Sequence, residues 1–374
     1  MGKFDSVIPV PGGPTPGAAG RSQGHKGRGA LAFTAHRFES IAREPVDDGW
    51  TPEPEGSAPV TQVIEEQAQS IISRNSSPDV PFDQSVNPYR GCEHGCVYCF
   101  ARPTHSYLNL SPGLDFETRI FAKMNAAELL RKALARPGYR CTPLAIGVAT
   151  DAYQPVERRL RLTRQVLEVC AEFNQPVGLI TKSAQIEEDL DLIADMAGRS
   201  LATVALSITT LDHGVSRHME PRTSAPRRRL ETIRRFVNAG VPVTVNVAPI
   251  VPFLTDHELE RILEAAAEAG AQRAGYIMLR LPWEVEPIFR EWLAARFPLK
   301  AAHVLSRIEA LRGGRHNDAR FGSRMSGEGI YAELIAKRFA IACARMGLDG
   351  QGRERMQTLD VSRFRVPSAQ AALF

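Results

Sequence analysis

The chain lacks most of the features by which secreted and membrane proteins are recognised. Only six of its 374 residues are cysteine, and Cys141, Cys170 and Cys343 are scattered singly, which does not suit a disulfide framework. The sequence MGKFDSVIPVPGGP has no apolar core as long as that of a signal peptide. The longest nearly apolar run, 241–254, is too short and too rich in proline to span a bilayer. We therefore expect a cytoplasmic protein that does not enter a membrane.

The chain also carries little excess charge. Its net charge is +4 and its pI is near 8.8, which is not by itself the mark of a nucleic-acid-binding protein. Residues 1–37 hold five lysines and arginines against one aspartate, and residues 38–66 hold eight acids against Arg43 alone. Such a segment could be an anion-seeking tail, but its glycine and proline content favours a solvated leader. We predict a largely disordered or extended N-terminal segment over residues 1–75.

Beyond this segment, short β-rich runs alternate with amphipathic stretches. The expected strands are 85–90, 144–150, 176–181, 201–208, 242–248 and 274–279, and the expected helices are 121–135, 159–174, 185–198, 226–239, 256–269 and 284–296. Strands that are apolar along most of their length and alternate with helices predict a parallel sheet with right-handed crossovers. Six such units form a curved sheet or partial barrel, because a closed barrel of the usual kind needs eight.

Residues 301–374 break this alternation. The stretch 312–331 is basic and rich in glycine, and 331–348 has a helical apolar period. We predict a C-terminal cap, made of a helix and a basic loop, that crosses the barrel mouth. The expected organisation is thus an N-terminal segment (1–75), a barrel (76–300) and a cap (301–374).

The most informative motif is the run NPYRGCEHGCVYCFARP, in which Cys92, Cys96 and Cys99 have the spacing C-x3-C-x2-C. Three thiolates can hold a [4Fe-4S] cluster and leave one iron open to a non-protein ligand. A structural zinc site is the alternative, with His94 or His105 as fourth ligand, although no second C-x2-C pair follows to complete a zinc ribbon. A third interpretation is that the thiols bind no metal. The spacing favours the cluster.

Polar residues follow several of the expected strands, where the loops of a parallel barrel meet. They are Thr150, Asp151, Lys182, Ser183, Ser207, Thr209 and Asn246. Any one of them alone is more typical of a helix cap or a solvated turn. Several together beside the cysteine loop would suit an amino-acid group bound to an open iron.

Between Ser85 and Pro282 the sequence resembles the radical S-adenosylmethionine (SAM) superfamily, and most of all the branch that contains spore photoproduct lyase and uncharacterised bacterial relatives. The resemblance rests on NPYRGCEHGCVYCFARPTH, TDAYQPVE, LITKS and the segment MEPRTSAP to VPFLTD. It implies a partial (β/α)6 barrel, a [4Fe-4S] cluster held by the three cysteines, and SAM on the fourth iron. It also implies reductive cleavage of SAM to a 5′-deoxyadenosyl radical that abstracts hydrogen from an unidentified substrate. A flavodoxin or ferredoxin would donate the electron, and the expected form is a monomer.

The resemblance assigns six further residues to SAM: Tyr98 beside the adenine, Thr150 and Asp151 at the amino group, Lys182 and Ser207 at the methionine carboxylate, and Ala248 against the adenine. Two departures from the lyases matter. The strand 144–150 lacks the cysteine that donates hydrogen in that branch, because Cys141 precedes the strand, and Phe100 stands where the lyases have a second tyrosine. We therefore expect the same first half-reaction on a substrate other than a thymine photodimer adduct. The catalytic residues that act on that substrate are not assigned.

The segment from Arg217 to Arg235 suggests one kind of substrate. It contains seven arginines, at 217, 222, 227, 228, 229, 234 and 235, and four more at 312, 315, 320 and 324 could extend the patch from the cap. Arginines at the mouth could grip the phosphates of a nucleic acid, with Tyr107, Tyr153 and Trp283 as stacking platforms. A solvated helix face is the plainer interpretation. Peptides and small anionic metabolites also stay open, and the competing function is a non-catalytic zinc or iron-sulfur module that binds nucleic acid.

Overall fold

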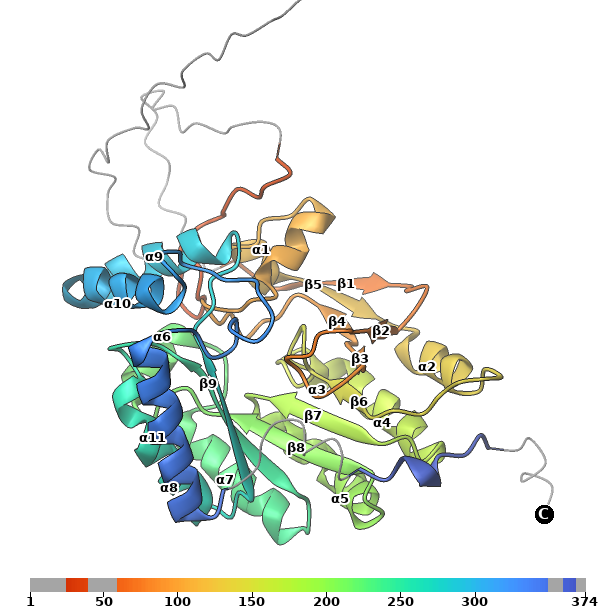
Figure 1. The fold of residues 1–374 in the computed structure, drawn as a ribbon. Coiled ribbons are helices and arrows are strands. Elements are labelled where there is room, and N and C mark those ends of the chain that lie inside the picture. The colour runs from red at the N-terminus through yellow and green to blue at the C-terminus, as the bar shows by residue number, and fades with distance from the viewer. Residues whose placement is uncertain (1–24, 40–58, 349–358, 368–374) are drawn as a thin grey trace, which may run out of the picture.

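The computed structural model describes residues 25–39, 59–348 and 359–367. A seven-stranded sheet in the order β10-β9-β8-β7-β6-β3-β2 organises them (Figure 1). Its strands are β2 (Ile72–Arg74), β3 (Gln84–Val86), β6 (Leu144–Ile146), β7 (Val177–Thr181), β8 (Ala202–Ser207), β9 (Val243–Ile250) and β10 (Arg273–Met278). All neighbouring pairs from β3 to β10 are parallel, and only β2 is antiparallel to its neighbour. The predicted α/β fold with a partial barrel of parallel strands is confirmed.

The central strands are buried on both faces. All six residues of β8 are buried, so this strand shows no alternation of apolar and polar residues. The connecting helices are α3 (Glu157–Leu160), α4 (Leu162–Glu172), α5 (Leu190–Gly198), α6 (His213–Met219), α7 (Pro226–Asn238), α8 (Leu259–Glu268) and α9 (Val285–Arg296). Apolar stripes on these helices, such as Ile233 and Phe236 of α7, join Val204 and Val245 of the strands in one core. The carboxyl ends of the strands consequently meet at one rim.

A second, three-stranded sheet departs from the predicted pattern. Residues 121–123, the first part of the helix expected over 121–135, belong instead to strand β5 (Arg119–Lys123), and α2 (Ala126–Leu134) follows it. Strand β5 lies between β1 (Gln62–Glu66) and β4 (Tyr89–Arg90). The expected strand 85–90 is therefore split between two sheets. These pairings join residues far apart in sequence, which local periodicity does not reveal.

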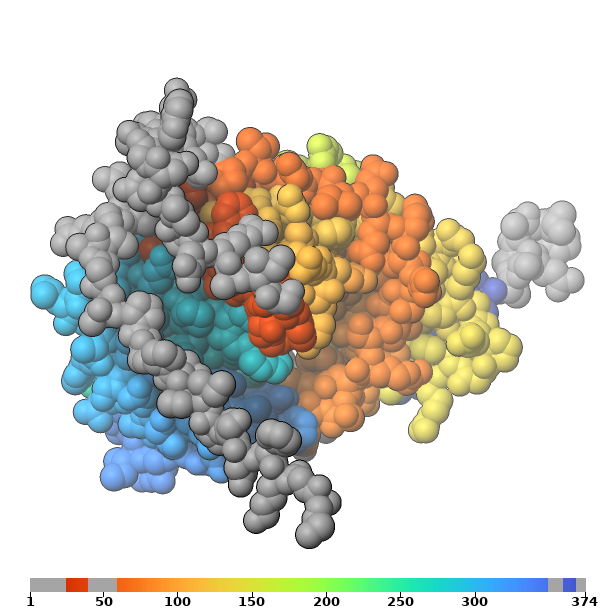
Figure 2. All heavy atoms as spheres, turned by 90° about the horizontal axis from the view of Figure 1, so that it is seen from above, coloured from red at the N-terminus to blue at the C-terminus, as the bar shows by residue number. Residues whose placement is uncertain are grey.

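Parts of the N-terminal segment belong to the folded structure. Strands β1 and β2 both lie before residue 76, and residues 28–31 are buried. Residues 1–24 and 40–58 of the expected disordered segment lie outside the described residues. The segment 25–39, red in Figure 2, lies between the orange-yellow N-terminal elements and the teal-blue elements of the second half.

The C-terminal region is helical, but its last helix does not cross the mouth as expected. Helix α10 (Pro298–Leu311) packs on α9, and α11 (Ile330–Met346) lies beside α8 in the outer layer (Figure 1). Arg338 of α11 pairs with Glu260 of α8 at 2.6 Å. The loop 312–329 instead joins the two edges of the open sheet, because Met278 N–H donates to the Met325 carbonyl and Gly322 N–H donates to Asp79. In the part of the chain that the structure describes, every helix is too short or too polar to cross a membrane.

Candidate active site

The three motif cysteines lie on one short loop at the rim. The loop follows β4 and precedes the 3-10 helix η1 (Arg102–Leu108). Cys92 N–H donates to the Phe116 carbonyl at 2.9 Å, and two turns follow, closed by the Cys92 and Cys96 carbonyls. Gly95 has φ 66°, which lies in the left-handed region that residues with a side chain rarely adopt. Cys92 and Cys96 are buried and Cys99 is partly buried, so one turn-rich loop presents three shielded thiols.

Electrostatics in this loop favour a cationic partner. Burial raises the pKa of the Cys92, Cys96 and Cys99 thiols, and repulsion among them raises the pKa of Cys92 further. Three thiolates are costly here unless a positively charged group neutralises them, as an iron-sulfur cluster does when it binds. The donor set and its burial therefore fit a cluster held by three cysteines.

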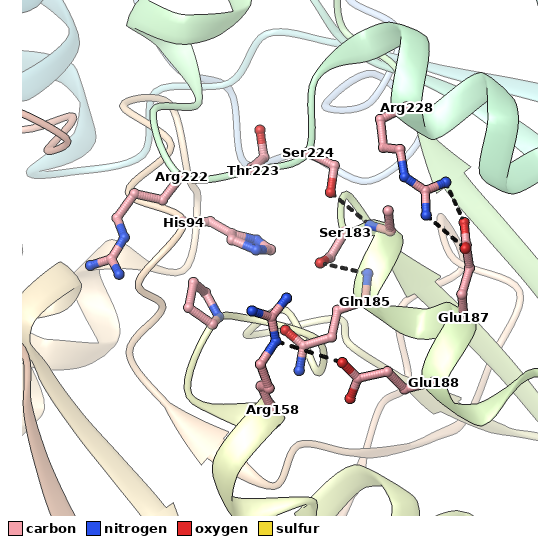
Figure 3. A pocket seen from close by; sticks show the side chains of 12 residues that line it. His94, Arg158, Ser183, Gln185, Glu187, Glu188, Arg222, Thr223, Ser224 and Arg228 are labelled. Atoms are coloured by element: carbon pink, nitrogen blue, oxygen red, sulfur yellow. Dashed lines mark hydrogen bonds and ion pairs between the residues drawn. The ribbon is translucent and has the colours of Figure 1, made fainter.

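The two histidines that a zinc site would need are engaged elsewhere. His94 Nδ1 lies 3.2 Å from the Asp151 carboxylate, and Figure 3 shows the His94 ring directed into a pocket. His105 Nε2 lies 3.0 Å from the Arg119 carbonyl, and its ring packs edge-on against Phe116. Among the described residues, no three His, Cys, Asp or Glu side chains are arranged to hold a single metal ion. The positions of the two histidines thus give no support to a zinc site on this loop.

Asp151 and Thr150 link the end of β6 to the cysteine loop. Thr150 Oγ1 donates to the Gly91 carbonyl at 2.7 Å. The Asp151 carboxylate accepts hydrogen bonds from Thr181 Oγ1 at 2.7 Å and from Lys182 N–H at 2.8 Å. Burial acts to raise the pKa of Asp151, but the His94 imidazole and these hydrogen bonds outweigh it and lower the pKa to about 2. Asp151 is therefore an ionised carboxylate next to the loop.

Lys182, Tyr98 and Ala248 meet in a second buried network. Lys182 Nζ donates to the Ala248 carbonyl at 2.9 Å and lies 5.7 Å from the centre of the Tyr98 ring. Lys182 Nζ also lies 3.3 Å from Glu220, to which the Tyr98 hydroxyl donates a hydrogen bond. Thr209 joins the network through a 2.6 Å hydrogen bond to Glu220. Three of the six residues assigned to SAM are thereby brought together.

The charges of this network do not cancel. Glu220 forms an ion pair with buried Arg229, and Arg229 also donates to the carbonyl of Ser207. Burial acts to raise the pKa of Glu220, but Arg229 and Lys182 outweigh it and hold the pKa well below its usual value. One carboxylate thus faces two cations, and the remaining positive charge of Lys182 suits a negatively charged ligand group.

Sequence reasoning missed the roles of Glu220 and Arg229. Both were placed in an arginine-rich stretch of a solvated helix or loop, yet their exposed fractions are 2% and 0%. A single acid in the run MEPRTSAPRRR was the available signal, because a lone carboxylate among cations is a natural ion-pair partner. Which of the three consecutive arginines turns inward depends on the start of α7 at Pro226, which local sequence fixes only within a few residues.

Most other arginines of the segment 217–235 have carboxylate partners. Arg228 and Arg235 both pair with Glu187, at 2.6 and 2.8 Å. Arg222 lies 3.3 Å from Glu93. The predicted basic patch is therefore largely neutralised by acids, and only part of it faces the rim.

The expected extension of this patch from the cap is wrong for Arg312. Its side chain is buried and donates to the carbonyls of Met278, Leu279, Ser323 and Arg324. Arg320 pairs with Asp318 at 2.9 Å, and Arg324 pairs with Asp79. The chain here uses arginine to hold backbone together, a role that composition does not reveal.

A pocket of about 640 Å³ opens beside the cysteine loop (Figure 3). Its lining is polar and includes His94, Arg158, Gln185, Glu188, Arg222 and Arg228. Gln185 Nε2 is buried and has no hydrogen-bond partner among the described residues. An orphan donor of this kind is unusual in a folded protein.

The structure also places four other residues that the sequence analysis considered, one cysteine and three aromatic residues. Cys141 precedes the first residue of β6 and contacts Gln175, so it lies at the end opposite the cysteine loop. Tyr153 is buried and its hydroxyl donates to Asp189, which excludes it as a stacking platform. Tyr107 and Trp283 are 69% and 65% exposed, as a stacking surface requires.

Comparison with known proteins agrees with this geometry. The family model of the radical SAM superfamily matches residues 86–266. An uncharacterized protein of Mycobacterium tuberculosis is 35% identical over 333 residues, which cover 85% of this chain and 94% of that protein. An uncharacterized protein of Methanocaldococcus jannaschii is 23% identical over 197 residues, covering 53% and 71% of the two chains.

Solved structures show a common fold. Spore photoproduct lyase complexed with dinucleoside spore photoproduct is 16% identical, with a TM-score of 0.55 over 76% of this chain and 79% of that chain. A mutant of the same lyase with bound AdoMet and the dinucleoside has a TM-score of 0.56 at 15% identity, over the same shares of the two chains. This chain therefore has the fold of spore photoproduct lyase.

Proposed function

The chain belongs to the radical SAM superfamily, and we propose that it is an enzyme that uses a [4Fe-4S] cluster and SAM to abstract hydrogen from an anionic substrate. One observation carries the proposal. Two buried thiols and one partly buried thiol share a single loop, and a buried network with unmatched positive charge lies beside them. The first feature suits a cluster with an open iron, and the second suits the carboxylate of an amino acid.

Cys92, Cys96 and Cys99 would hold the cluster through their thiolates. A cluster held there and reduced by a donor such as a flavodoxin or ferredoxin would supply one electron to the sulfonium of SAM, whose S–C5′ bond would break to give methionine and a 5′-deoxyadenosyl radical. The burial of the loop excludes water from the reacting groups and limits side reactions of a radical.

Lys182 and Asp151 are proposed to orient the amino-acid end of SAM. Lys182 would bind the carboxylate through its unmatched charge, and Ser207, whose carbonyl accepts a hydrogen bond from Arg229, is proposed as a second partner. Asp151 would attract the ammonium group, because its lowered pKa keeps it ionised at neutral pH, and Thr150 would support it. Tyr98 and Ala248 meet Lys182 in one network and are proposed to flank the adenine.

Replacement of one motif cysteine tests the cluster. Cys96→Ala should take up little iron on anaerobic reconstitution, and the absorbance of the cluster should be lost with it. Cys141→Ala removes a thiol at the other end of the barrel and is the matched control, so it should bind iron like the wild type. Equal iron uptake by Cys96→Ala and the wild type would contradict the proposal.

For the substrate we propose an anionic molecule, with nucleic acid as the leading class. The support is the pocket beside the cysteine loop, which Arg158, Arg222 and Arg228 line. Glu187 and Glu188 also line it, so the pocket can distinguish ligands by the position of their charge. Arginine recognises phosphate through paired hydrogen bonds, which suits this lining.

Binding of a labelled single-stranded oligonucleotide tests this class. Affinity measured by anisotropy should fall as salt rises, and Arg158→Ala should weaken binding by roughly 10- to 100-fold, since a charge-assisted contact contributes about 1.5–3 kcal/mol. Arg261→Ala changes a helix residue outside the pocket and serves as the control. If the oligonucleotide does not bind at low salt, or if Arg158→Ala binds it normally, nucleic acid is excluded at this pocket.

A further inference from the structure

The segment 25–39, here called the N-terminal strap, packs directly against the cysteine loop. Gly29 N–H and Ala30 N–H donate to the two carboxylate oxygens of Glu117, at 2.9 and 2.8 Å. Arg28 donates to the Glu117 carbonyl at 2.9 Å and to the Pro59 carbonyl at 2.6 Å. The strap is therefore attached by its backbone, and Glu117 is fully buried beneath it.

Glu117 connects the strap to the backbone of the cysteine loop through Arg102. Arg102 is also fully buried, and its Nη2 lies 2.5 Å from Glu117. The same guanidinium donates to the Gly95 carbonyl at 3.0 Å and to the Cys96 carbonyl at 2.9 Å. The Glu117 carboxylate thus binds the strap backbone on one side. On its other side it orients Arg102, which donates to two carbonyls of the cysteine loop.

The strap and the loop approach so closely that a side chain at residue 29 would not fit. A Cβ atom on Gly29 would lie 1.8 Å from the Gly95 carbonyl oxygen and 3.0 Å from Val97. A Cβ on Gly95 would in turn lie 2.6 Å from Glu117. The distances of 1.8 and 2.6 Å are shorter than any van der Waals contact. The two backbones can therefore lie this close only because residues 29 and 95 are both glycine.

The other end of the strap is anchored at the start of α9, a helix that itself packs on Cys96, Val97 and Tyr98 of the cysteine loop. Arg37 Nη1 lies 2.8 Å from Glu284, which precedes α9, and the Arg37 guanidinium lies 4.4 Å from the centre of the Trp283 ring. Ala30 packs with Ile288 of α9. The strap thus contacts both the region of the cysteine loop and α9, and Figure 2 shows its red atoms between the orange-yellow and the teal-blue parts of the chain.

We propose that the N-terminal strap fixes the cysteine loop in its cluster-holding conformation, with Gly29, Arg102 and Glu117 as positioning residues. This inference rests on the proposed cluster but concerns its retention, since none of the three side chains is a ligand. Loosening the strap should release the Gly95 and Cys96 carbonyls and expose the loop. The cluster would then lose iron faster, while the barrel core stays folded.

Iron release from the anaerobically reconstituted full chain into a chelator tests the proposal. Glu117→Gln keeps the size of the side chain but turns an NH₂ group toward a strap N–H, and Gly29→Ala forces the backbones apart. Each should release iron about 10- to 100-fold faster than the wild type, the range in which outer-shell changes act on metal sites. The controls are Glu172→Gln, an exposed glutamate paired with Arg131, and Lys26→Ala, an exposed position of the strap.

Arg37→Ala cuts the distant anchor and leaves the buried contacts of Glu117 intact, so it should fold even if Gly29→Ala does not. It should also speed iron release, with little change in the melting temperature of the iron-free protein. The proposal is overturned if Glu117→Gln and Arg37→Ala release iron at the wild-type rate, or if their rates change only in step with melting temperature. A wild-type chain that takes up no iron would overturn the proposed function as well as the role of the strap. A wild-type chain that holds iron, together with variants that release it at the wild-type rate, would overturn the role of the strap alone.

Discussion

At the scale of single residues, the site is a set of buried charges in which one carboxylate faces two cations. Glu220 and Arg229 form one neutral pair. Lys182 also contacts Glu220, so the three side chains together carry one excess positive charge. Buried charges without full partners are expensive, so such an arrangement persists where a ligand completes it. The methionine carboxylate of SAM has the charge and the hydrogen-bonding capacity to do so.

Lys182→Ala should separate SAM binding from cluster binding. The variant should keep its iron, because Lys182 is not a ligand, and should bind SAM roughly 10- to 100-fold more weakly, as expected for the loss of a charge-assisted hydrogen bond of about 1.5–3 kcal/mol. Anaerobic equilibrium dialysis with SAM and an iron assay measure the two properties. Lys132→Ala, a surface lysine paired with Glu128, is the control. Normal SAM binding by Lys182→Ala would remove Lys182 from the site.

His105 should make stability depend on pH. Burial lowers its pKa from 6.5 to about 4, so the folded chain resists protonation of this ring while the unfolded chain accepts it. Its stabilising contribution is present above pH 6.5 and is lost as pH falls towards 4. Between pH 7.5 and 5 this removes roughly 2 kcal/mol of unfolding free energy.

Denaturant unfolding of the iron-free protein at several pH values measures this effect. In His105→Gln the fall in unfolding free energy between pH 7.5 and 5 should be smaller by that amount, whereas the exposed control His257→Gln should keep the wild-type slope. If His105→Gln and the wild type show the same pH dependence, the ring is not held neutral by burial.

The location of a residue in the fold could be predicted where its position relative to a strand determines that location. Lys182 and Asp151 follow strands, and strand ends converge in any parallel barrel, so their place at the rim could be predicted. The burial of Arg229 could not, because it depends on how α7 is rotated against β8. His94 was considered as a ligand from its place between two cysteines, but the direction of its ring depends on Asp151, which lies 57 residues further along the chain.

At the scale of elements, strand β5 shows the limit of periodicity. Its sequence RIFAK continues into a helical pattern, and only its neighbours β1 and β4 make it a strand. Five of the six expected barrel strands were predicted within a few residues because each is apolar in its own sequence, whereas the more polar stretch 85–90 is split between β3 and β4. A strand whose pattern is ambiguous takes its structure from partners that are distant in the chain.

Arg312 should be important for attachment of the loop 312–329. Arg312→Met removes donors to four backbone carbonyls, and we expect a loss of about 2–4 kcal/mol, because buried acceptors are left without partners. Chemical denaturation measures the loss, and limited proteolysis should cut the loop faster. Arg315→Met changes an exposed arginine of the same loop and should behave as the wild type. An unchanged unfolding free energy in Arg312→Met would show that the loop is held by other contacts.

At the scale of the whole molecule, two segments outside the barrel units connect parts of the chain that are far apart in sequence. The loop 312–329 connects β10 to the chain after β2, and residues 25–39 connect the cysteine loop to α9. The barrel was predictable because its repeated pattern extends over most of the chain. The two connecting segments were not, since glycine- and arginine-rich sequence carries no periodicity and its contacts are made by backbone and buried charge.

The central claim is that a cluster held by three cysteines leaves one iron for SAM. The most direct test is to incubate the anaerobically reconstituted chain with dithionite and SAM and to measure 5′-deoxyadenosine and methionine by mass spectrometry. The account predicts both products in equal amounts from the wild type and neither from Cys96→Ala. An iron-loaded wild-type chain that forms no 5′-deoxyadenosine, or a chain that binds zinc in place of iron, would contradict it.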